Sequence, residues 1–159
     1  MKEILLSTGG MVFVDDEDFE ILNSHRWYCR KGGNKFYAGR ANGKRGIFLM
    51  HRVILNVTDP NVFVDHIDGD GLNNQRSNLR IATKMQNAYN MGSNKNTSSR
   101  FKGVCWKKKN KVWTAQISAN KITKHIGCYK SEIEAAIAYN EASKKLHGEF
   151  ALLNQIEIL

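Results

Sequence analysis

Alternation of apolar and polar residues divides the first third of the chain into short segments that are typical of β-strands. Apolar or aromatic runs are separated by turn residues such as Gly9-Gly10 and Asn42-Gly43, which punctuate strands in mixed folds. We expect strands at residues 11–14, 27–30, 36–40 and 47–50. Residues 15–22 begin with acidic side chains, which the helix dipole favours at an N-terminus. Residues 51–56 can begin another short helix, ending before Asp59-Pro60.

The pattern from residue 62 to residue 91 predicts a strand, a loop, a second strand and a helix. Residues 62–66 and 79–82 are the expected strands, and the Gly, Asp and Asn residues between them indicate a loop. Thr83 and Gln86 have the spacing of a capping box, so a helix should begin at Thr83. Gly92 is well placed to end it.

The remainder predicts a small sheet covered by one helix. Residues 92–100 are polar without periodicity and are expected to form a linker. Strands are expected at 103–107, 112–118 and 122–129. Ser131 and Glu134 form a second capping box, and Gly148 should end that helix. The chain is therefore expected to be an α+β protein with one domain at 1–91 and another at 101–159.

Charge is concentrated in one block of the sequence. The 159 residues include 24 Lys and Arg against 15 Asp and Glu, giving a net charge of +9. Residues 92–130 contain ten Lys or Arg and no acidic residue. Such a block predicts a surface that binds phosphate groups, with a merely solvated basic face as the alternative.

The cysteines and the apolar runs exclude several classes of protein. Cys29, Cys105 and Cys128 are the three cysteines and have no CxxC spacing, which argues against a disulfide framework and a zinc ribbon. No apolar run approaches the length of a membrane span, and the N-terminus lacks the features of a signal peptide. We expect a cytoplasmic protein with no membrane segment.

Asp65, His66, Asn78 and Asn87 form a set suited to phosphodiester hydrolysis. The reaction needs a deprotonated water and neutralised charge on the phosphate and the leaving oxygen. A hard divalent cation prefers oxygen ligands, so Asp65 and Asn87 are candidate ligands if the helix folds back against the first strand. His66 is the candidate general base because its unperturbed pKa lies near working pH. Asn78 is expected to hold the other ring nitrogen of His66.

Other polar residues have either a structural or a functional role. Asp68, Asp70, Asn73 and Asn74 are expected to shape the loop by bonding its own backbone. Arg80 either contacts phosphate or fastens the loop. His51 either lines the cleft or is a core histidine, and the core role is favoured. His25, His125 and His147 show no ligand spacing.

Residues 64–87, reading VDHIDGDGLNNQRSNLRIATKMQN, resemble the ββα-metal motif of HNH nucleases, in the form common in phage and intron homing endonucleases. The resemblance extends upstream through FLMHR at 48–52 and covers roughly residues 4–90, with its motif core at 62–91. It implies a divalent metal, Mg²⁺ or alternatively Mn²⁺, bound by Asp65 and Asn87, with His66 as base and Asn78 positioning it. The last position of the motif is Asn87 where the family name has a histidine.

Basic and aromatic residues interleave from residue 100 to residue 130. A sheet that carries lysines on one face can enter the major groove, with lysines on phosphates and Gln116 on a base edge. Trp106 and Trp113 could contact DNA, although a core role for at least one is favoured.

This region resembles the AP2 DNA-binding domain through FKGVCW (101–106), VWTAQI (112–117), HIGCY (125–129) and residues 131–154. That family has a three-stranded antiparallel sheet packed on one helix. The expected DNA contacts are Lys102, Lys107, Lys109, Gln116, Ser118, Lys124 and His125. Cys105, Ser118 and Lys109 depart from the plant-type pattern, so no target sequence follows.

The sequence therefore predicts a site-specific DNA endonuclease of the HNH homing type, in which the second domain anchors the first on double-stranded DNA. No protein partner is implied. One alternative is a DNA-binding regulator that retains an inactive nuclease fold. Another is a role on RNA, for which the sequence shows no RNA-binding signature.

Overall fold

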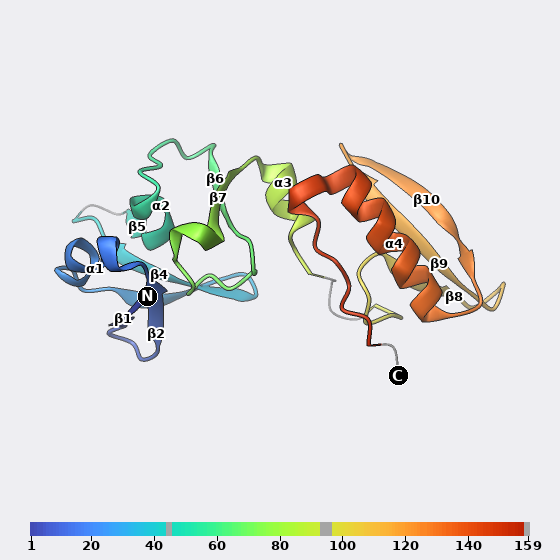
Figure 1. Cartoon of the computed structure of the whole chain (residues 1–159), viewed down its shortest axis with the longest axis horizontal. Coiled ribbons are helices and arrows are strands. Elements are labelled where there is room, and N and C mark those ends of the chain that lie inside the picture. Colours follow the sequence, from blue (N-terminus) through green and yellow to red (C-terminus); the bar gives the residue numbers. More distant parts are fainter. Residues whose placement is uncertain (44–45, 93–96, 158–159) are drawn as a thin grey trace. The chain divides into compact units, whose positions relative to one another are not determined.

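The computed structural model describes residues 1–43, 46–92 and 97–157. The chain divides into two compact units, Met1–Asn87 and Ala88–Leu159 (Figure 1). Strands and helices are mixed throughout, which confirms the expected α+β class. Most of the predicted linker at 92–100 cannot be assessed, because residues 93–96 lie outside the described ranges.

The first unit is built from short antiparallel sheets and short helices. Its elements are β1 (Lys2–Leu5), β2 (Met11–Val14), α1 (Asp16–Asn23), β3 (Tyr28–Gly32), β4 (Lys35–Ala41), β5 (Ile47–Leu49), α2 (Met50–Ile54), β6 (Phe63–His66), the 3-10 turn η1 (Arg76–Asn78), β7 (Leu79–Ala82) and α3 (Lys84–Tyr89). Strand β1 pairs with β2, β4 lies between β3 and β5, and β6 pairs with β7. All the strands predicted here are present within about two residues of the expected ends. Strand β1 was not predicted, because its four residues carry one buried apolar side chain.

One apolar cluster holds the first unit together. Trp27 lies at its centre, 1% exposed, and its Nε1 donates to Leu22 O at 2.7 Å. Burying a side chain of this size favours folding strongly, provided that its N–H finds an acceptor. The other buried members are Ile4, Leu6, Val12, Val14, Leu22, Ala38, Met50, Ile54 and Leu79.

The loop between β6 and β7 is attached to the N-terminal hairpin. Phe13 N donates to Leu72 O at 2.9 Å, and Asn74 N donates to Phe13 O at 2.7 Å. These bonds form a parallel bridge between Phe13 and Asn73. Arg76 adds paired bonds of 2.8 and 2.7 Å to the Asp18 carboxylate on α1. The loop that follows β6 is therefore fixed by residues more than fifty positions earlier.

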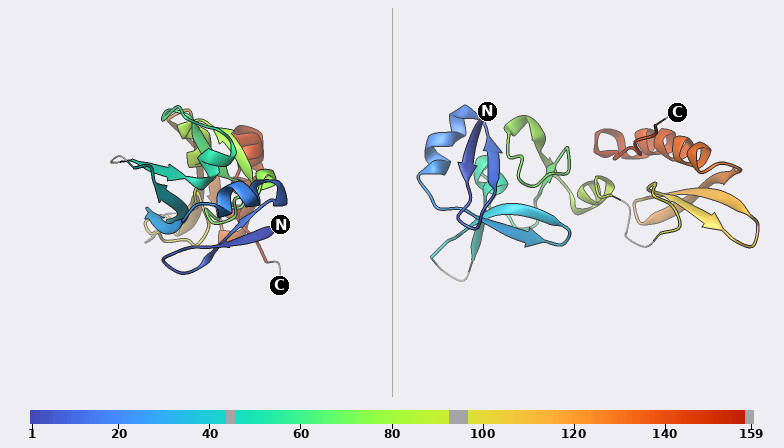
Figure 2. Two further views of the ribbon diagram at one scale, coloured as in Figure 1. Left: turned by 90° about the vertical axis from the view of Figure 1, so that its left-hand side faces the viewer. Right: turned by 90° about the horizontal axis from the view of Figure 1, so that it is seen from below.

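The second unit is a three-stranded antiparallel sheet with a single long helix across one face (Figure 2). Its elements are β8 (Val104–Lys107), β9 (Val112–Ala119), β10 (Ile122–Tyr129), α4 (Glu132–His147) and the 3-10 turn η2 (Gly148–Phe150). Ala115 on β9 and Ala135 and Ala136 on α4 are completely buried. Their small side chains let the helix approach the sheet closely. Trp113 and Tyr129 pack at the edge of this core, which confirms a core role for one of the two tryptophans.

Both predicted capping residues are at helix starts. Thr83 N donates to Gln86 Oε1 at 2.8 Å and Gln86 N donates to Thr83 Oγ1 at 3.2 Å, the reciprocal bonds of a capping box. Ser131 Oγ accepts from Ile133 N at 3.2 Å and caps α4. Gly148 ends α4 with a positive φ of 56°, as expected of a terminal glycine. Helix α3 ends at Tyr89, before Gly92.

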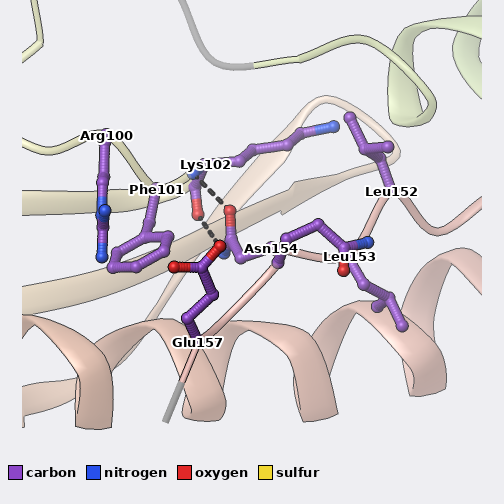
Figure 3. Close-up of a pocket in the computed structure, with 8 residues that line it drawn as sticks. Arg100, Phe101, Lys102, Leu152, Leu153, Asn154 and Glu157 are labelled. Atoms are coloured by element: carbon purple, nitrogen blue, oxygen red, sulfur yellow. Dashed lines mark hydrogen bonds between the residues drawn. The ribbon is translucent and has the colours of Figure 1, made fainter. Parts of the chain in front are cut away.

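The segment after η2 is fixed to the start of the second unit through one carboxamide (Figure 3). Asn154 Oδ1 accepts from Lys102 N at 2.7 Å and its Nδ2 donates to Lys102 O at 3.1 Å. An amide side chain can satisfy both backbone groups of one residue in this way. A pocket of about 300 Å³ lies around these bonds, lined by Arg100, Phe101, Leu152 and their neighbours. It holds no cluster of catalytic side chains.

Candidate active site

The end of strand β6 places two polar side chains in the interior. Asp65 pairs with Arg80 and His66 with Leu79 across the β6–β7 ladder. Asp65 is 2% exposed and His66 4% exposed, although adjacent strand residues normally point to opposite faces. The chain turns directly after His66, where Gly69 N donates to His66 O at 2.9 Å. Both side chains are enclosed because the strand ends there.

A pocket of about 240 Å³ collects the predicted catalytic residues. Asp65 and His66 from β6 and Asn87 from α3 all line it. The structure therefore brings together three of the four side chains expected at the site. The rest of the lining consists of Lys35, Tyr37, Leu49, His51, Arg52, Pro60, Phe63 and Val64.

Asp65 forms a buried ion pair with the arginine opposite it. Arg80 Nε and Nη2 lie 3.0 and 2.7 Å from Asp65 Oδ2, and the Arg80 side chain is 13% exposed. A phosphate contact or a loop contact was expected for Arg80; in the structure its guanidinium pairs with Asp65, and the phosphate contact stays a prediction. The guanidinium fixes the Asp65 carboxylate and balances its charge inside the protein, where an uncompensated charge is costly.

Burial dominates the titration of His66. It lowers the pKa of His66 below the ordinary 6.5, and the positive charge of Lys35 acts in the same direction. The nearby Asn74 side chain and the negative charges of Asp68 and Asp65 act against this shift. The net effect is a neutral imidazole at neutral pH, which is the form that accepts a proton.

Asn78 makes different bonds from those expected. Its Oδ1 accepts from Asp68 N at 3.0 Å, and its Nδ2 donates to Asp68 Oδ1 at 2.8 Å and to Asn73 O at 2.9 Å. The oxygen and both N–H groups of Asn78 are thus used within the loop and not on the His66 ring. Asn78 fixes the loop, because it is buried and bonds to both Asp68 and Asn73.

The remaining polar residues of this loop act as predicted on the loop backbone. Asp68 Oδ1 accepts from Asp70 N at 2.8 Å, and Asp70 Oδ1 accepts from Leu72 N at 2.9 Å. Asn73 Nδ2 donates to Asp68 Oδ2 at 2.7 Å. Burial opposes ionisation of Asp68, but the bonds from Asn78, the Asp70 N–H and Asn73 outweigh it and lower the pKa.

The donor set in the pocket suits a hard divalent cation. Asp65 offers a carboxylate oxygen and Asn87 a carboxamide oxygen, and both line one pocket. Among the residues that the structure describes, no group of three or more His, Cys, Asp or Glu could hold a metal by itself. Two protein oxygens, with water and phosphate completing the shell, are typical of Mg²⁺ rather than of a structural zinc site.

Sequence reasoning missed part of this pocket. Tyr37 lies on β4, and its ring centroid is 5.8 Å from that of His66 and 5.6 Å from that of His51. Lys35 begins the same strand. His51 is 6% exposed and lines the pocket, and its buried Nδ1 has no hydrogen-bond partner among the described residues, so it lines the cleft and is not the satisfied core histidine that was favoured. The alternation along β4 was the available signal, but nothing in it shows that this strand crosses the site.

The face of the second sheet opposite α4 carries several of the predicted DNA contacts. Cross-strand pairing places Gln116 opposite His125, and Ser118 opposite Thr123, on the side away from the buried Ala115 and Ile117. Lys107 ends β8 in register with Val112 on the same side. Gln116, Ser118, His125, Lys107 and the turn residue Lys109 are all exposed.

Lys102 and Lys124 do not lie where DNA contacts were expected. Lys102 Nζ donates to Tyr89 O, and burial lowers its pKa to about 8. Its ammonium is therefore held inside the second unit. Lys124 pairs with Ile117, which places it on the α4 side of the sheet, opposite to His125. Both corrections depend on strand register and on a loop contact, which charge counting does not reveal.

The chain is similar to known nucleases and viral proteins. The model of a family described as HNH endonuclease matches residues 49–89, which include His51, both strands of the site and Asn87. An uncharacterized HNH endonuclease of Acanthamoeba polyphaga mimivirus is 36% identical over 151 residues, covering 94% of this chain and 77% of the relative. Protein 3.8 of Escherichia phage T7 is 33% identical over 89 residues, covering 56% of this chain and 73% of that protein. No solved structure matches the chain. In the parts of the chain that are described, no helix is long and apolar enough to span a bilayer.

Proposed function

Because the chain belongs to the HNH endonuclease family, we propose that it cuts DNA at the pocket between β6 and α3, as a site-specific nuclease of the homing type. The observation that carries the proposal is the shared pocket of Asp65, His66 and Asn87. These side chains come from two elements, and their types match the needs of phosphodiester hydrolysis.

His66 is the proposed general base. Its ring is buried and neutral, and it lies in contact distance of Tyr37 and His51, which restrict its orientation. A neutral imidazole can take the proton of the attacking water, and removal of such a base typically costs a factor of about 100 to 10,000 in rate. The loop fixed by Asn78 would keep the ring in place.

Asp65 and Asn87 are the proposed ligands of one divalent cation, Mg²⁺ in the first instance. Such an ion, when bound, neutralises charge on the phosphate and on the leaving oxygen. Arg80 Nε and Nη2 both donate to Asp65 Oδ2. The ion pair thereby orients the carboxylate relative to the pocket before any ligand binds.

The second unit is the proposed anchor on double-stranded DNA. Lysines border the open face of its sheet, and Gln116, Ser118 and His125 project from the middle of that face. Lysines at the border suit phosphates, and the central polar side chains suit base edges in the major groove. This arrangement supports the resemblance to an AP2 domain, and Lys107 and Lys109 are the phosphate contacts that we retain.

The test is conversion of supercoiled plasmid to nicked or linear DNA. The plasmid carries the DNA that flanks the gene, and wild type, His66→Ala and Asn87→Ala are compared in Mg²⁺, Mn²⁺ and EDTA. We expect cleavage by wild type that requires metal and falls at least about 100-fold in His66→Ala. His25→Ala, at an exposed position outside the pocket, is the matched control and should cleave normally.

Two outcomes would contradict the proposal. Equal cleavage by wild type and both variants would assign the activity to another site or a contaminant. Tight DNA binding by wild type without cleavage in either metal would instead favour a regulator that keeps the nuclease fold. The nicked-to-linear ratio would show whether one or both strands are cut.

A further inference from the structure

His51 lies in the candidate catalytic pocket although it stands outside the strand–loop–strand–helix segment that carries the other site residues. It belongs to α2, whose position is fixed by the neighbouring arginine. Arg52 Nη1 donates to Val62 O at 2.7 Å and Arg52 Nη2 donates to Asp59 O at 2.6 Å. These bonds attach α2 to the segment that leads into β6. His51 is therefore held at a constant place beside His66.

One nitrogen of His51 is buried and lacks a partner. The residue is 6% exposed, and no residue in the described ranges hydrogen-bonds to His51 Nδ1. Nearly all buried polar atoms in folded proteins are bonded, and an unsatisfied one costs about 1 to 3 kcal/mol. The ring lines the same pocket as Asp65, His66 and Asn87. A ligand in that pocket is the natural partner of this atom.

The aromatic neighbours of His51 fix the plane of its ring. Its centroid lies 5.0 Å from that of His66 with the rings at 86°, and 5.6 Å from that of Tyr37 at 65°. Both are edge-to-face arrangements, which are favourable and directional. A ring held in this way can present a nitrogen in a defined direction without further ordering.

The same surroundings keep the imidazole neutral. Burial, then the neighbouring His66 and Arg52, lower the pKa of His51 to about 3. A neutral imidazole has one N–H donor and one acceptor nitrogen. The non-bridging oxygens of a phosphodiester only accept hydrogen bonds. A phosphate facing Nδ1 would therefore select the tautomer that carries the proton there.

We propose that His51 is a second catalytic histidine, whose Nδ1–H donates a hydrogen bond to a non-bridging oxygen of the scissile phosphodiester. The inference rests on the proposed nuclease function and assigns a substrate contact to a residue outside the strand–loop–strand–helix segment. Such a donor stabilises charge that develops on the phosphate, and loss of one comparable donor lowers rates by a factor of about 100 to 1,000.

Three substitutions separate this role from simple packing. His51→Asn places an amide N–H near the position of Nδ1, His51→Gln places one near Nε2, and His51→Leu removes both. The substrates are the plasmid described above and bis(4-nitrophenyl) phosphate, which needs no sequence recognition. We expect the rate to fall about 100-fold in His51→Leu and His51→Gln and at most about tenfold in His51→Asn.

Further measurements exclude loss of folding or of metal as the cause. Circular dichroism and Mn²⁺ titration calorimetry should give wild-type spectra and metal affinity for His51→Asn and His51→Gln. The loss should be uniform across pH, since a neutral donor does not titrate near neutrality. His25→Leu is the matched control for a histidine outside the pocket and should keep the wild-type rate.

The outcomes distinguish the two proposals. If wild type cleaves and the Asn and Gln variants are equally active, or equally impaired, the His51 contact is refuted while the nuclease function stands. If wild type cleaves neither substrate in Mg²⁺ or Mn²⁺, both proposals fall. If His51→Leu does not fold, the Asn and Gln pair still decides the question, because the two amides differ only in where the N–H lies.

Discussion

Asp65 and Arg80 face each other in the β6–β7 ladder, so the candidate metal ligand already has a cationic partner within the protein. A metal ion that approaches the pocket meets a carboxylate whose charge is partly balanced. The guanidinium thus has two consequences of opposite sign, because it stabilises the fold and weakens the attraction for a second cation.

We predict that Arg80→Ala destabilises the protein, and that Mg²⁺ restores part of the loss. Removing one partner of a buried pair typically costs about 3 to 5 kcal/mol, because the other charge remains buried. A bound cation would take over part of that neutralisation at Asp65. Thermal unfolding in EDTA and in Mg²⁺ measures both effects.

The matched control for this experiment is Arg76→Ala. Arg76 also binds a carboxylate, that of Asp18, but it is 45% exposed and lies outside the pocket. Its loss should be smaller and independent of Mg²⁺. An Arg80→Ala loss that is the same in EDTA and Mg²⁺ would show that Arg80 acts through packing alone.

The pH dependence of cleavage follows from the titration of His66. The base must be neutral to accept a proton, so the rate should fall as pH decreases through the pKa of His66. Burial lowers that pKa below 6.5, so the rate should reach half its maximum below pH 6.5. Single-turnover rates at saturating metal would measure it, and a midpoint above pH 6.5 would contradict a buried neutral base.

Individual site residues could be predicted from the sequence with a definite role where they belong to one recognisable motif. Asp65, His66 and Asn87 lie within one short segment, and the capping residue Thr83 fixed the start of the helix that carries Asn87. Tyr37 and His51 reach the pocket from other elements. Their places depend on how β4 and α2 pack, which residue types and spacing do not encode.

At the scale of elements, α3 is short and depends on its cap. It has six residues, and none of them is buried. Such a helix gains little from packing, so the reciprocal bonds between Thr83 and Gln86 carry much of its stability. This matters for the site because Asn87 lies within its first turns.

Thr83→Ala should therefore weaken metal binding as well as the fold. Loss of an N-cap costs about 1 kcal/mol, and fraying of α3 would move Asn87 away from Asp65. Mn²⁺ titration calorimetry and chemical denaturation measure the two effects. Ser131→Ala removes the cap of α4, which carries no metal donor, so it should lower stability and leave metal affinity unchanged. Equal metal affinity in both variants would contradict the role of Asn87.

Helix boundaries were predictable because capping is local, as at Thr83, Ser131 and Gly148. The pairing between strands was harder to predict. The bulge in β10 between His125 and Gly127 alters which residues share a face, and this irregularity has no signature in the alternation of the sequence. Lys124 and His125, which the sequence analysis placed in one group of contacts, lie on opposite faces because adjacent strand residues alternate.

At the scale of the molecule, the excess positive charge belongs to the second unit, and its use can be measured through salt. Each phosphate that a lysine neutralises adds about −0.9 to the slope of log binding constant against log salt concentration. We predict that Lys107→Ala and Lys109→Ala each make this slope shallower by about that amount. Lys102→Met should leave it unchanged, because the ammonium bonds to Tyr89 O.

Fluorescence anisotropy with labelled duplex DNA at several salt concentrations would give these slopes. The order of effects is the informative result, since all three lysines belong to the same basic block of sequence. A slope for Lys102→Met that is shallower than the wild-type slope would mean that Lys102 leaves its carbonyl partner on binding DNA. The sequence shows how many lysines the basic block contains, but only the fold shows which of these three have an ammonium free to contact DNA.

The pairing of Phe13 with the loop after β6 has a consequence for how this nuclease could be engineered. The recognisable motif covers residues 62–91, and it is tempting to transplant that stretch as a cassette onto another DNA-binding scaffold. Its loop, however, forms backbone hydrogen bonds with β2 and a side-chain bond with a carboxylate on α1. A graft that leaves out the N-terminal hairpin would contain every proposed catalytic residue but would lack the hydrogen bonds that hold the loop. The smallest transplantable part therefore begins with the hairpin itself.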